Sequence, residues 1–518
     1  MGQSSVVLSR RSFLAGGMGL AAVRSGLAQT ERPHFQTSPF TLGVASGDPA
    51  ADGAVLWTRL APEPLTDGGM PPSAVEVVWE VARDDRMRQI VRSGAAIARP
   101  ESAHAVHVEV AGLQENRPYW YRFRAGGASS AIGRTRTLPA AGAAVDRLRF
   151  AFASCQHYEF GHFTAYEHLA AEDLDLVFHL GDYIYEGSRR ADLTDEPIPR
   201  RHLDPEAVTL DQYRRRYAQY HLDPALQAAH AASPWMVTWD DHEVENNYAA
   251  SVSERNVPAG EFLSRRAAAY QAYYEHMPLR RTAAPDGPSA RLYRRLSYGT
   301  LGAFFVLDTR QYRSDQPCGG GLAAPCDAAF DPAATMMGAP QRAWLIDGLD
   351  RSRARWNIIP QQVMMAGVDF SRQGDRRIAM DHWSGYQAER TRFLQFLADR
   401  RPSNPIVLTG DIHNHWVNDL RVDFDDPKSR TIGTEFVGTS ISSGGDGEDM
   451  PVTMPPVLAR NGFVRFFNSQ RGYVSCELTP SRMRAELRVL DYVSRPGARR
   501  RTRAAFVVED GRCGAQRA

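Results

Sequence analysis

Lysine is almost absent from this sequence: Lys428 is its single lysine, and nearly all of the 61 basic residues are arginine. The 60 acidic residues nearly cancel them, which leaves a formal net charge of +1. A protein that binds a polyanion by bulk electrostatics needs a concentrated basic surface. The charge balance therefore argues against specific nucleic-acid binding.

Long apolar runs are also lacking after the N-terminus. A helix that spans a bilayer needs about 20 consecutive apolar residues, and no segment of the remaining chain approaches this length. We therefore expect no integral membrane segment in the mature chain. The 518 residues are enough to bury a large core, and this length is typical of two domains, here one small and one large.

Cysteine is scarce as well, with five residues in the whole chain. Cys318 and Cys326 flank a loop rich in glycine, alanine and proline, and in an oxidising compartment they are the natural disulfide pair. Cys476 lies in a strand-like segment and is expected to be a buried apolar residue. Cys513 lies in a polar tail. Cys155 is therefore left without a nearby partner and needs another explanation.

The first residues have the features of an export signal. Arg10 and Arg11 form a twin-arginine pair, and a weakly apolar stretch, residues 15–23, leads to a small-residue end. This order of charged, apolar and small residues is typical of a signal that is removed. We predict a signal peptide over residues 1–28, with a weaker alternative cleavage site at residues 21–22. The twin-arginine (Tat) export machinery would then carry the folded protein to the periplasm or the extracellular space.

The N-terminal part of the mature chain has the sequence pattern of an all-β domain. Short alternating segments separated by glycine, proline and aspartate turns fill residues 40–138. About seven short strands within a hundred residues are typical of an immunoglobulin-like or fibronectin-like sandwich. We predict this domain over residues 35–139, followed by a linker rich in alanine at residues 138–144.

From residue 148 onward, near-continuous apolar strands alternate with helical stretches. The strand-like segments are residues 148–153, 174–180, 236–239, 303–307 and 405–409. Strands of this kind are buried on both faces of a sheet, as in α/β folds. We therefore predict an α/β catalytic domain over residues 147–500.

Side chains of the metal-binding type directly follow four of these strands. They are Cys155; Asp182 and Tyr185; Asp240, Asp241 and His242; and Asp411 and His413. Because loops at the carboxyl ends of strands form the ligand crevice of α/β sheets, we expect these side chains to converge. Carboxylates that approach one another raise each other's pKa unless a cation lies between them. The pattern predicts a two-metal hydrolase in which Asp182 is shared by both ions.

Several motifs in these loops resemble those of the calcineurin-like metallophosphatases, which include the purple acid phosphatases. Residues 181–185 (GDYIY) resemble the GDxxY motif, residues 239–243 (WDDHE) stand where the superfamily has GNHE, and residues 410–413 (GDIH) stand where it has GHxH. Together with residues 153–156 (ASCQ), they resemble the PhoD-type alkaline phosphatases more closely than any other branch. Residues 40–49 (FTLGVASGDP) resemble the start of that family's N-terminal β-domain.

The resemblance implies both a fold and an activity. The fold is an αββα sandwich preceded by the small all-β domain. The activity is that of an exported, metal-dependent phosphoesterase that hydrolyses phosphomonoesters and/or diesters by a metal-bound water or hydroxide. An alternative is a phospholipase D-like phosphodiesterase that acts on lipid or polymer diesters. A non-catalytic binding protein is a further hypothesis, which would be favoured if a ligand of the predicted cluster were missing, and none is.

The resemblance also implies a ferric ion beside calcium, and it assigns side chains to each. Fe3+ would be held by Tyr185, Cys155 and His413. Asp182 would bridge the two metals. Ca2+, a hard cation that prefers carboxylate oxygens, would be held by Asp241 and Asp411.

Three further residues would act beside these ligands. Asp240 is the alternative to Asp241, because we expect only one of the adjacent pair to face the cluster. It would otherwise lie just outside the metal ligands or belong to a second calcium site. His242 would contact phosphate or protonate the departing alkoxide. Arg310 would steer the phosphate by a bidentate contact.

Two sets of amides complete the candidates. Asn246 and Asn247 would contact the substrate or supply further oxygen ligands, or they are only turn residues. The superfamily's remaining histidine ligand, on another strand, has no clear counterpart. The nearest candidates are Gln361 and Gln362, which follow the apolar segment 358–360.

Overall fold

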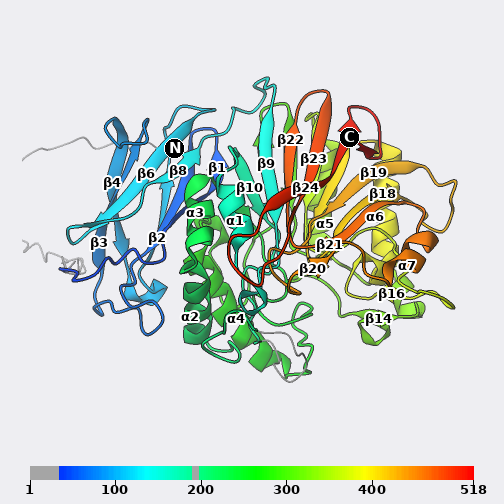
Figure 1. Ribbon diagram of the computed structural model, residues 1–518, viewed down its shortest axis with the longest axis horizontal. Coiled ribbons are helices and arrows are strands. Elements are labelled where there is room, and N and C mark those ends of the chain that lie inside the picture. The colour runs from blue at the N-terminus through cyan, green and yellow to red at the C-terminus, as the bar shows by residue number, and fades with distance from the viewer. Residues whose placement is uncertain (1–33, 189–197) are drawn as a thin grey trace, which may run out of the picture.

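The computed structural model describes residues 34–188 and 198–518. The predicted signal peptide, residues 1–28, lies outside the described residues. Within them, the chain forms two large β-sheets that pack face to face and a smaller sheet near the N-terminus (Figure 1). Helices cover the outer face of each large sheet. The αββα sandwich that the resemblance implied is thus confirmed.

The first large sheet has ten strands and contains three of the predicted ligand-bearing strands. Its order is β25 (Gln516–Arg517), β24 (Arg500–Glu509), β23 (Arg482–Leu490), β22 (Gly472–Leu478), β9 (Leu148–Ala153), β10 (Leu176–His179), β11 (Trp235–Val237), β1 (Val44–Ala50), β2 (Gly53–Arg59) and β5 (Ala105–Val110). Strands β9, β10 and β11 pair in parallel, whereas β22 runs antiparallel to β9. The three central strands therefore end at the same edge of the sheet.

The second large sheet has eight strands and contains the fourth ligand-bearing strand. Its order is β12 (Arg294–Tyr298), β13 (Gly302–Val306), β15 (Trp356–Pro360), β17 (Pro405–Thr409), β19 (Thr431–Val437), β18 (His415–Arg421), β21 (Val464–Gln470) and β20 (Gly447–Glu448). Strands β13, β15, β17 and β19 are parallel. Residues 411–413 follow β17 at the carboxyl end of this parallel set.

Alternate residues of the central strands face two different cores. In β9, Phe150 and Phe152 are buried between the two sheets, whereas Ala151 and Ala153 pack against the helical layer. This alternation follows from the period of two residues in a strand. Burial on both faces explains why these strands are almost continuously apolar.

Seven α-helices of the described chain cover the two sheets. Helices α1 (Thr164–Ala170), α2 (Leu210–His221), α3 (Pro224–Ala232) and α4 (Ala259–His276) pack on the first sheet. Helices α5 (Gly338–Asp350), α6 (Gln387–Arg400) and α7 (Met454–Arg460) pack on the second. None of the helices in the described ranges combines the length and the apolar character that a membrane crossing requires.

The N-terminal part is all-β, as predicted, but one of its two layers belongs to the first large sheet. The smaller sheet consists of β4 (Ile90–Ala98), β3 (Val75–Ala82), β6 (Pro118–Ala125) and β7 (Ala128–Ser129), with β8 (Gly133–Arg136) paired to β6. It packs on β1, β2 and β5. Strand β1 pairs in parallel with β11 through Gly47 and Trp235, so the two parts share one continuous sheet.

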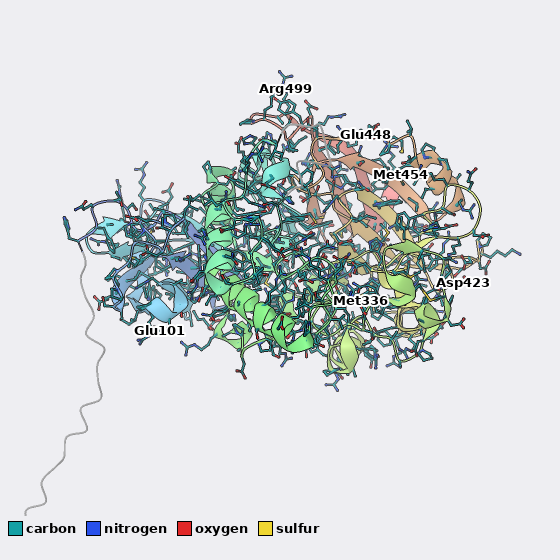
Figure 2. The ribbon with its side chains drawn as sticks, turned by 90° about the horizontal axis from the view of Figure 1, so that it is seen from below. Glu101, Met336, Asp423, Glu448, Met454 and Arg499 are labelled. Carbon is teal, nitrogen blue, oxygen red and sulfur yellow. A yellow bond between two sulfur atoms is a disulfide. The ribbon has the colours of Figure 1, made fainter. Side chains whose placement is uncertain are left out.

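The molecule is elongated along the axis that runs from the N-terminal strands to the far end of the second sheet. In the view from below, Glu101 lies toward the N-terminal strands and Asp423 lies at the opposite end (Figure 2). Strand β8 ends at residue 136 and β9 begins at residue 148, on either side of the predicted linker. The boundaries at residues 139 and 147 stay a prediction.

Candidate metal centre

The predicted ligands lie in the loops that follow β9, β10, β11 and β17. Four of them have a left-handed backbone: Cys155, Asp182, Asp411 and His413, with φ between 55° and 64°. A non-glycine residue in this region costs about 1–3 kcal/mol, and such residues cluster at functional sites because the surrounding structure must hold them there. The tight turns aim these side chains at the space where the two sheets meet.

Three overlapping groups of donor atoms lie in this space. The groups are Cys155, Asp182 and His413; then Asp182, Asp241 and His242; and then Asp240, Asp241 and Asp411. Within each group, one ligand atom from every residue lies within 4.8 Å of the others. The first two groups share Asp182, and the last two share Asp241. The donors therefore form one continuous cluster, and its first part differs chemically from its last.

Tyr185 belongs to the first part of the cluster. Its hydroxyl donates to Asp182 Oδ2 at 2.8 Å and lies 3.1 Å from His413 Nε2. It also accepts a hydrogen bond from Ser443 Oγ at 2.7 Å. A phenol, a thiol, an imidazole and a carboxylate thus meet at one point.

Burial shifts the pKa of several groups in the cluster. Burial raises the pKa of the Cys155 thiol and of the Tyr185 phenol well above their usual values. Burial likewise raises the pKa of Asp182, and the neighbouring carboxylates of Asp241 and Asp240 raise it further. Asp182 Oδ1 and Asp240 Oδ2 are buried, and no described residue forms a hydrogen bond with either atom. Because unpaired buried polar atoms are costly, these atoms fit cation binding.

Asp240 and Asp241 both place a carboxylate oxygen in the third donor group, although we expected only one of the pair to face the cluster. Which of the two binds a metal stays a prediction. Strand β11 ends at Val237, so the two aspartates lie in a loop where the alternation of a strand no longer applies. Asp241 Oδ2 accepts the backbone N–H of Asn247 at 2.7 Å. Asp240 Oδ1 instead accepts from Arg310.

Arg310 is fully buried among carboxylates. Its Nη1 and Nη2 donate to the two oxygens of Asp381 at 2.7 and 2.9 Å, and its Nε donates to Asp240. Its Nη2 also lies 3.7 Å from Asp241 and 3.6 Å from Asp411. The bidentate contact of this arginine is thus with Asp381. The predicted contact with phosphate stays a prediction.

His242 forms a pair with a buried carboxylate. Its Nδ1 lies 2.7 Å from Glu186 Oε2, and its ring centre lies 4.1 Å from that of Tyr185. Burial alone would lower the pKa of His242, but Glu186, Asp241 and Asp182 raise it well above its usual value. His242 is therefore suited to carry a proton beside the cluster.

Asn246 and Asn247 point their side-chain amides away from the cluster. Both donate Nδ2 to the carboxylate of Glu254, at 2.7 and 2.8 Å. Their backbone N–H groups instead support the site, because Asn246 donates to Glu186 and Asn247 to Asp241. A contact of their side chains with substrate stays a prediction.

Sequence reasoning missed Asp381 and His382. His382 Nε2 lies 3.1 Å from Asp411 Oδ2, and Asp381 pairs with Arg310 and Arg313. The two residues follow β16 (Ile378–Ala379), a strand of only two residues, so no apolar run marks their position. An acidic residue next to a histidine was the only signal in the sequence.

The glutamines considered for a missing ligand belong to the scaffold. Gln361 donates to Thr409 Oγ1 at 2.7 Å, and Gln362 donates to Thr238 Oγ1 at 2.9 Å. Neither belongs to the three donor groups. They instead tie β15 to the loop ends of neighbouring strands.

Two further buried side chains hold the ligand-bearing loops in place. The carboxylate of Glu243 accepts the backbone N–H groups of Asp182, Tyr183 and Asp240, at 3.2, 2.5 and 2.8 Å. Arg471 Nη1 donates to the carbonyl of His413 at 2.5 Å. Sequence reasoning assigned no role to either residue.

The remaining cysteines are separate from the cluster. A disulfide joins Cys318 to Cys326. Cys476 lies in the core between the two sheets, and Cys513 is exposed. Cys155 is a free, buried thiol within the donor cluster.

An αββα sandwich that gathers such donors at the ends of its central strands defines the class of the calcineurin-like metallophosphatases. Sequence comparison refines this class. The profile of the PhoD-like phosphatases matches residues 150–487, and the profile of the PhoD-like phosphatase N-terminal domain matches residues 26–139. The chain belongs to the PhoD-like phosphatase family.

A known protein sequence and a solved structure are both similar over nearly the whole chain. Alkaline phosphatase D of Bacillus subtilis (strain 168) is 49% identical over 514 residues, which cover 98% of this chain and 88% of that protein. The solved structure of PhoD matches with a TM-score of 0.92 and 50% identity, over 94% of this chain and 93% of that one. The chain is thus a metal-dependent phosphoesterase of the alkaline phosphatase type. The alternative of a phospholipase D-like enzyme is not favoured.

Proposed function

We propose that this phosphoesterase hydrolyses phosphomonoesters and/or diesters outside the cytoplasm with Fe3+ and Ca2+ held in its donor cluster. The proposal rests on the different kinds of donor atoms in the two parts of that cluster. One part combines a thiol, a phenol and an imidazole with Asp182, and the other part offers only carboxylates and His242 around Asp182 and Asp241.

The first part suits a trivalent iron. Cys155 and Tyr185 would bind as thiolate and phenolate, and His413 would bind through a neutral ring nitrogen. Burial lowers the pKa of His413 to about 4, so its ring is neutral at and above neutral pH, as a ligand must be. The positive charge of the ion would offset the burial that raises the pKa of the thiol and the phenol.

The second part suits calcium, which prefers oxygen ligands of flexible number. Asp241, Asp240 and Asp411 would supply them, and Asp182 would bridge to the iron. Asp182 Oδ1 and Asp240 Oδ2 support this assignment, because a buried carboxylate oxygen without a donor is costly and neither atom has one in the described chain. Asp381 pairs with Arg310 and Arg313, and Arg310 also lies 3.6 Å from Asp411.

The chain's own residues would orient the substrate and supply a proton. The bound ions would provide positive charge for the phosphoryl oxygens and lower the pKa of water. His242, held through Nδ1 by Glu186, would present Nε2 to the leaving group and protonate the departing alkoxide. Glu243 and Arg471 would keep the ligand loops in position.

Metal analysis combined with a substrate panel tests the proposal. The purified enzyme should contain both iron and calcium, and it should have a visible absorption band from tyrosinate bound to iron. Rates on phosphomonoesters and diesters would be measured on the same preparation. A colourless, iron-free protein with full activity would contradict the iron assignment.

We also propose that residues 1–28 direct export by the Tat machinery. A double variant, Arg10→Lys with Arg11→Lys, should keep the phosphatase in the cytoplasm of the producing cells, because the arginine pair is the feature that the machinery reads. Activity in cell fractions measures the outcome. Unchanged export of the double variant would contradict the assigned route.

A further inference from the structure

A pocket lies where the N-terminal strands meet helix α2. Its volume is about 730 Å3. It is lined by Arg59 at the end of β2, the turn at residues 63–72, residues 100–104 and the first turns of α2, and none of the predicted ligands lines it. This volume is typical of pockets that hold small molecules.

Arg59 forms part of the wall of this pocket. Only 4% of Arg59 is exposed. Its Nε donates to the carbonyl of Ala103 at 2.8 Å, and its Nη1 lies 2.8 Å from His276 Nε2. The Nδ1 of His276 donates to the carbonyl of Ala272 at 2.7 Å, so Nε2 of this neutral ring is the acceptor. Both contacts of the guanidinium are therefore with uncharged groups.

The remaining nitrogen of Arg59, Nη2, has no hydrogen-bond partner among the described residues. It lies beside Gly68 in the pocket wall, where a side-chain Cβ at Gly68 would be 3.6 Å from it. Burial lowers the pKa of Arg59 to about 10, so the group still carries its charge at neutral pH. The nearby carboxylate of Glu275 raises this pKa, but it is hydrogen-bonded to Arg214, and no hydrogen bond or ion pair joins it to Arg59 in the described chain. A buried cation without an anion in contact is unfavourable. An anion in the pocket would supply the missing partner.

The other charged side chains of the pocket differ in how deeply they are buried. Arg214 is paired with the buried carboxylate of Glu275 at 2.6 Å. Arg215 donates only its Nε, to Asp204 at 2.8 Å, and both of its Nη groups lack a partner in the described ranges. The acidic residues of the lining, Glu63, Asp67 and Asp211, are exposed. Arg214 also lies 3.6 Å from Asp211. The buried part of the wall thus presents the charge of Arg59, Arg215 is half-buried, and the acidic side chains lie where water screens them.

The wall of the pocket also has apolar parts. Leu65, Met70 and several prolines line it together with the arginines. An inorganic ion alone would leave these apolar surfaces exposed to water, whereas a ligand with an apolar group attached to its anionic group would cover them. A guanidinium binds phosphate and carboxylate groups by the same planar geometry.

We propose that this pocket binds a small organic oxyanion, in which a phosphate or carboxylate group pairs with Arg59 and Arg215 and an apolar body lies against Leu65 and Met70. This site is additional to the metal centre. It is formed jointly by the N-terminal strands and by α2, so an occupant would bridge the two parts of the molecule.

Crystals of the metal-loaded enzyme soaked with para-bromobenzoate or with para-bromophenylphosphonate would locate the ligand by the anomalous signal of bromine. We expect bromine in this pocket with at least one of the two probes. The comparison identifies which anionic group the pocket prefers. Bromine found only at the metal cluster, or nowhere, would overturn the proposal.

Titration calorimetry with the preferred probe tests the same site in solution. Arg59→Met should weaken binding at this site by about tenfold or more, since it removes a charged donor. Thr66→Trp, an exposed position in the lining, should block the pocket without touching the buried contacts of Arg59. Arg88→Met, an exposed charge outside the pocket, is the control and should bind as the unmodified enzyme does. Undiminished affinity in Thr66→Trp would refute the assignment even if Arg59→Met fails to fold.

Discussion

Glu243→Gln is the change that best separates ligand positioning from general stability. Glu243 is buried, and its carboxylate accepts three backbone N–H groups. Oε2 accepts from Asp182 and Asp240, and Oε1 accepts from Tyr183. The side chain therefore joins the loop after β10 to the loop after β11. Burial raises its pKa to about 7, so it is largely ionised under alkaline conditions.

The magnitude follows from the lost hydrogen bonds. Glutamine keeps one oxygen and turns an NH2 group toward the other backbone donors, so one or two of the three bonds are lost. A hydrogen bond to a charged group contributes about 1.5–3 kcal/mol, and a backbone N–H left buried adds to the cost. We expect the free energy of unfolding to fall by about 2–4 kcal/mol. We also expect a displaced Asp182 to bind metal more weakly.

The assay compares metal content, kcat and thermal unfolding, with Glu389→Gln as a matched control. Glu389 is also a buried glutamate that accepts two backbone N–H groups, those of Met336 and Met337. It belongs to none of the donor groups. Both variants should unfold at lower temperature, but only Glu243→Gln should lose iron, calcium and kcat at temperatures where it is folded. Equal losses in the two variants, or full metal content in Glu243→Gln, would refute the positioning role.

Three further predictions concern the cluster itself. Cys155→Ala should lose iron, the visible band and activity while leaving the fold intact. Normal iron content and activity would make this thiol merely structural. Glu186→Gln should move the alkaline decline of kcat to lower pH. The carboxylate of Glu186 raises the pKa of His242, and a proton donor must stay protonated to act. An unchanged pH profile would exclude His242 as that donor. Chelation of calcium should abolish turnover and added calcium should restore it, whereas undiminished turnover in the chelator would count against calcium.

The central strands and the edge at which the ligands meet were predictable because local pattern determines both. A strand buried on both faces must be apolar along its length, as β9 is, and the parallel arrangement brings the carboxyl ends together. Residues 153–156 and 181–185 could therefore be placed near each other without knowledge of the order of strands. The paired aspartates after β11 show the limit of the pattern, because alternation ends with the strand.

Long-range pairing was not predictable in the same way. The parallel pair of Gly47 with Trp235 joins residues nearly two hundred positions apart, and nothing local to either segment encodes the partner. Gly47 is required there, because a Cβ at this position would lie 2.5 Å from the carbonyl oxygen of Pro278. The sequence pattern indicated two separate parts, whereas this contact makes one continuous sheet. Asp381 and His382 were not predicted for a related reason, because only tertiary contacts bring them to the cluster.

The charges around Arg310 indicate where in the cluster added cations are needed. The guanidinium is paired with Asp240 through Nε and with Asp381 through both Nη groups. Arg313 supplies a second positive charge to Asp381. The two arginines offset at most two of the four carboxylates on their side, Asp240, Asp241, Asp381 and Asp411. In the described chain Asp182 has no arginine partner and an unpaired Oδ1. Because negative charge remains in both parts of the cluster, we expect added cations on both sides of Asp182.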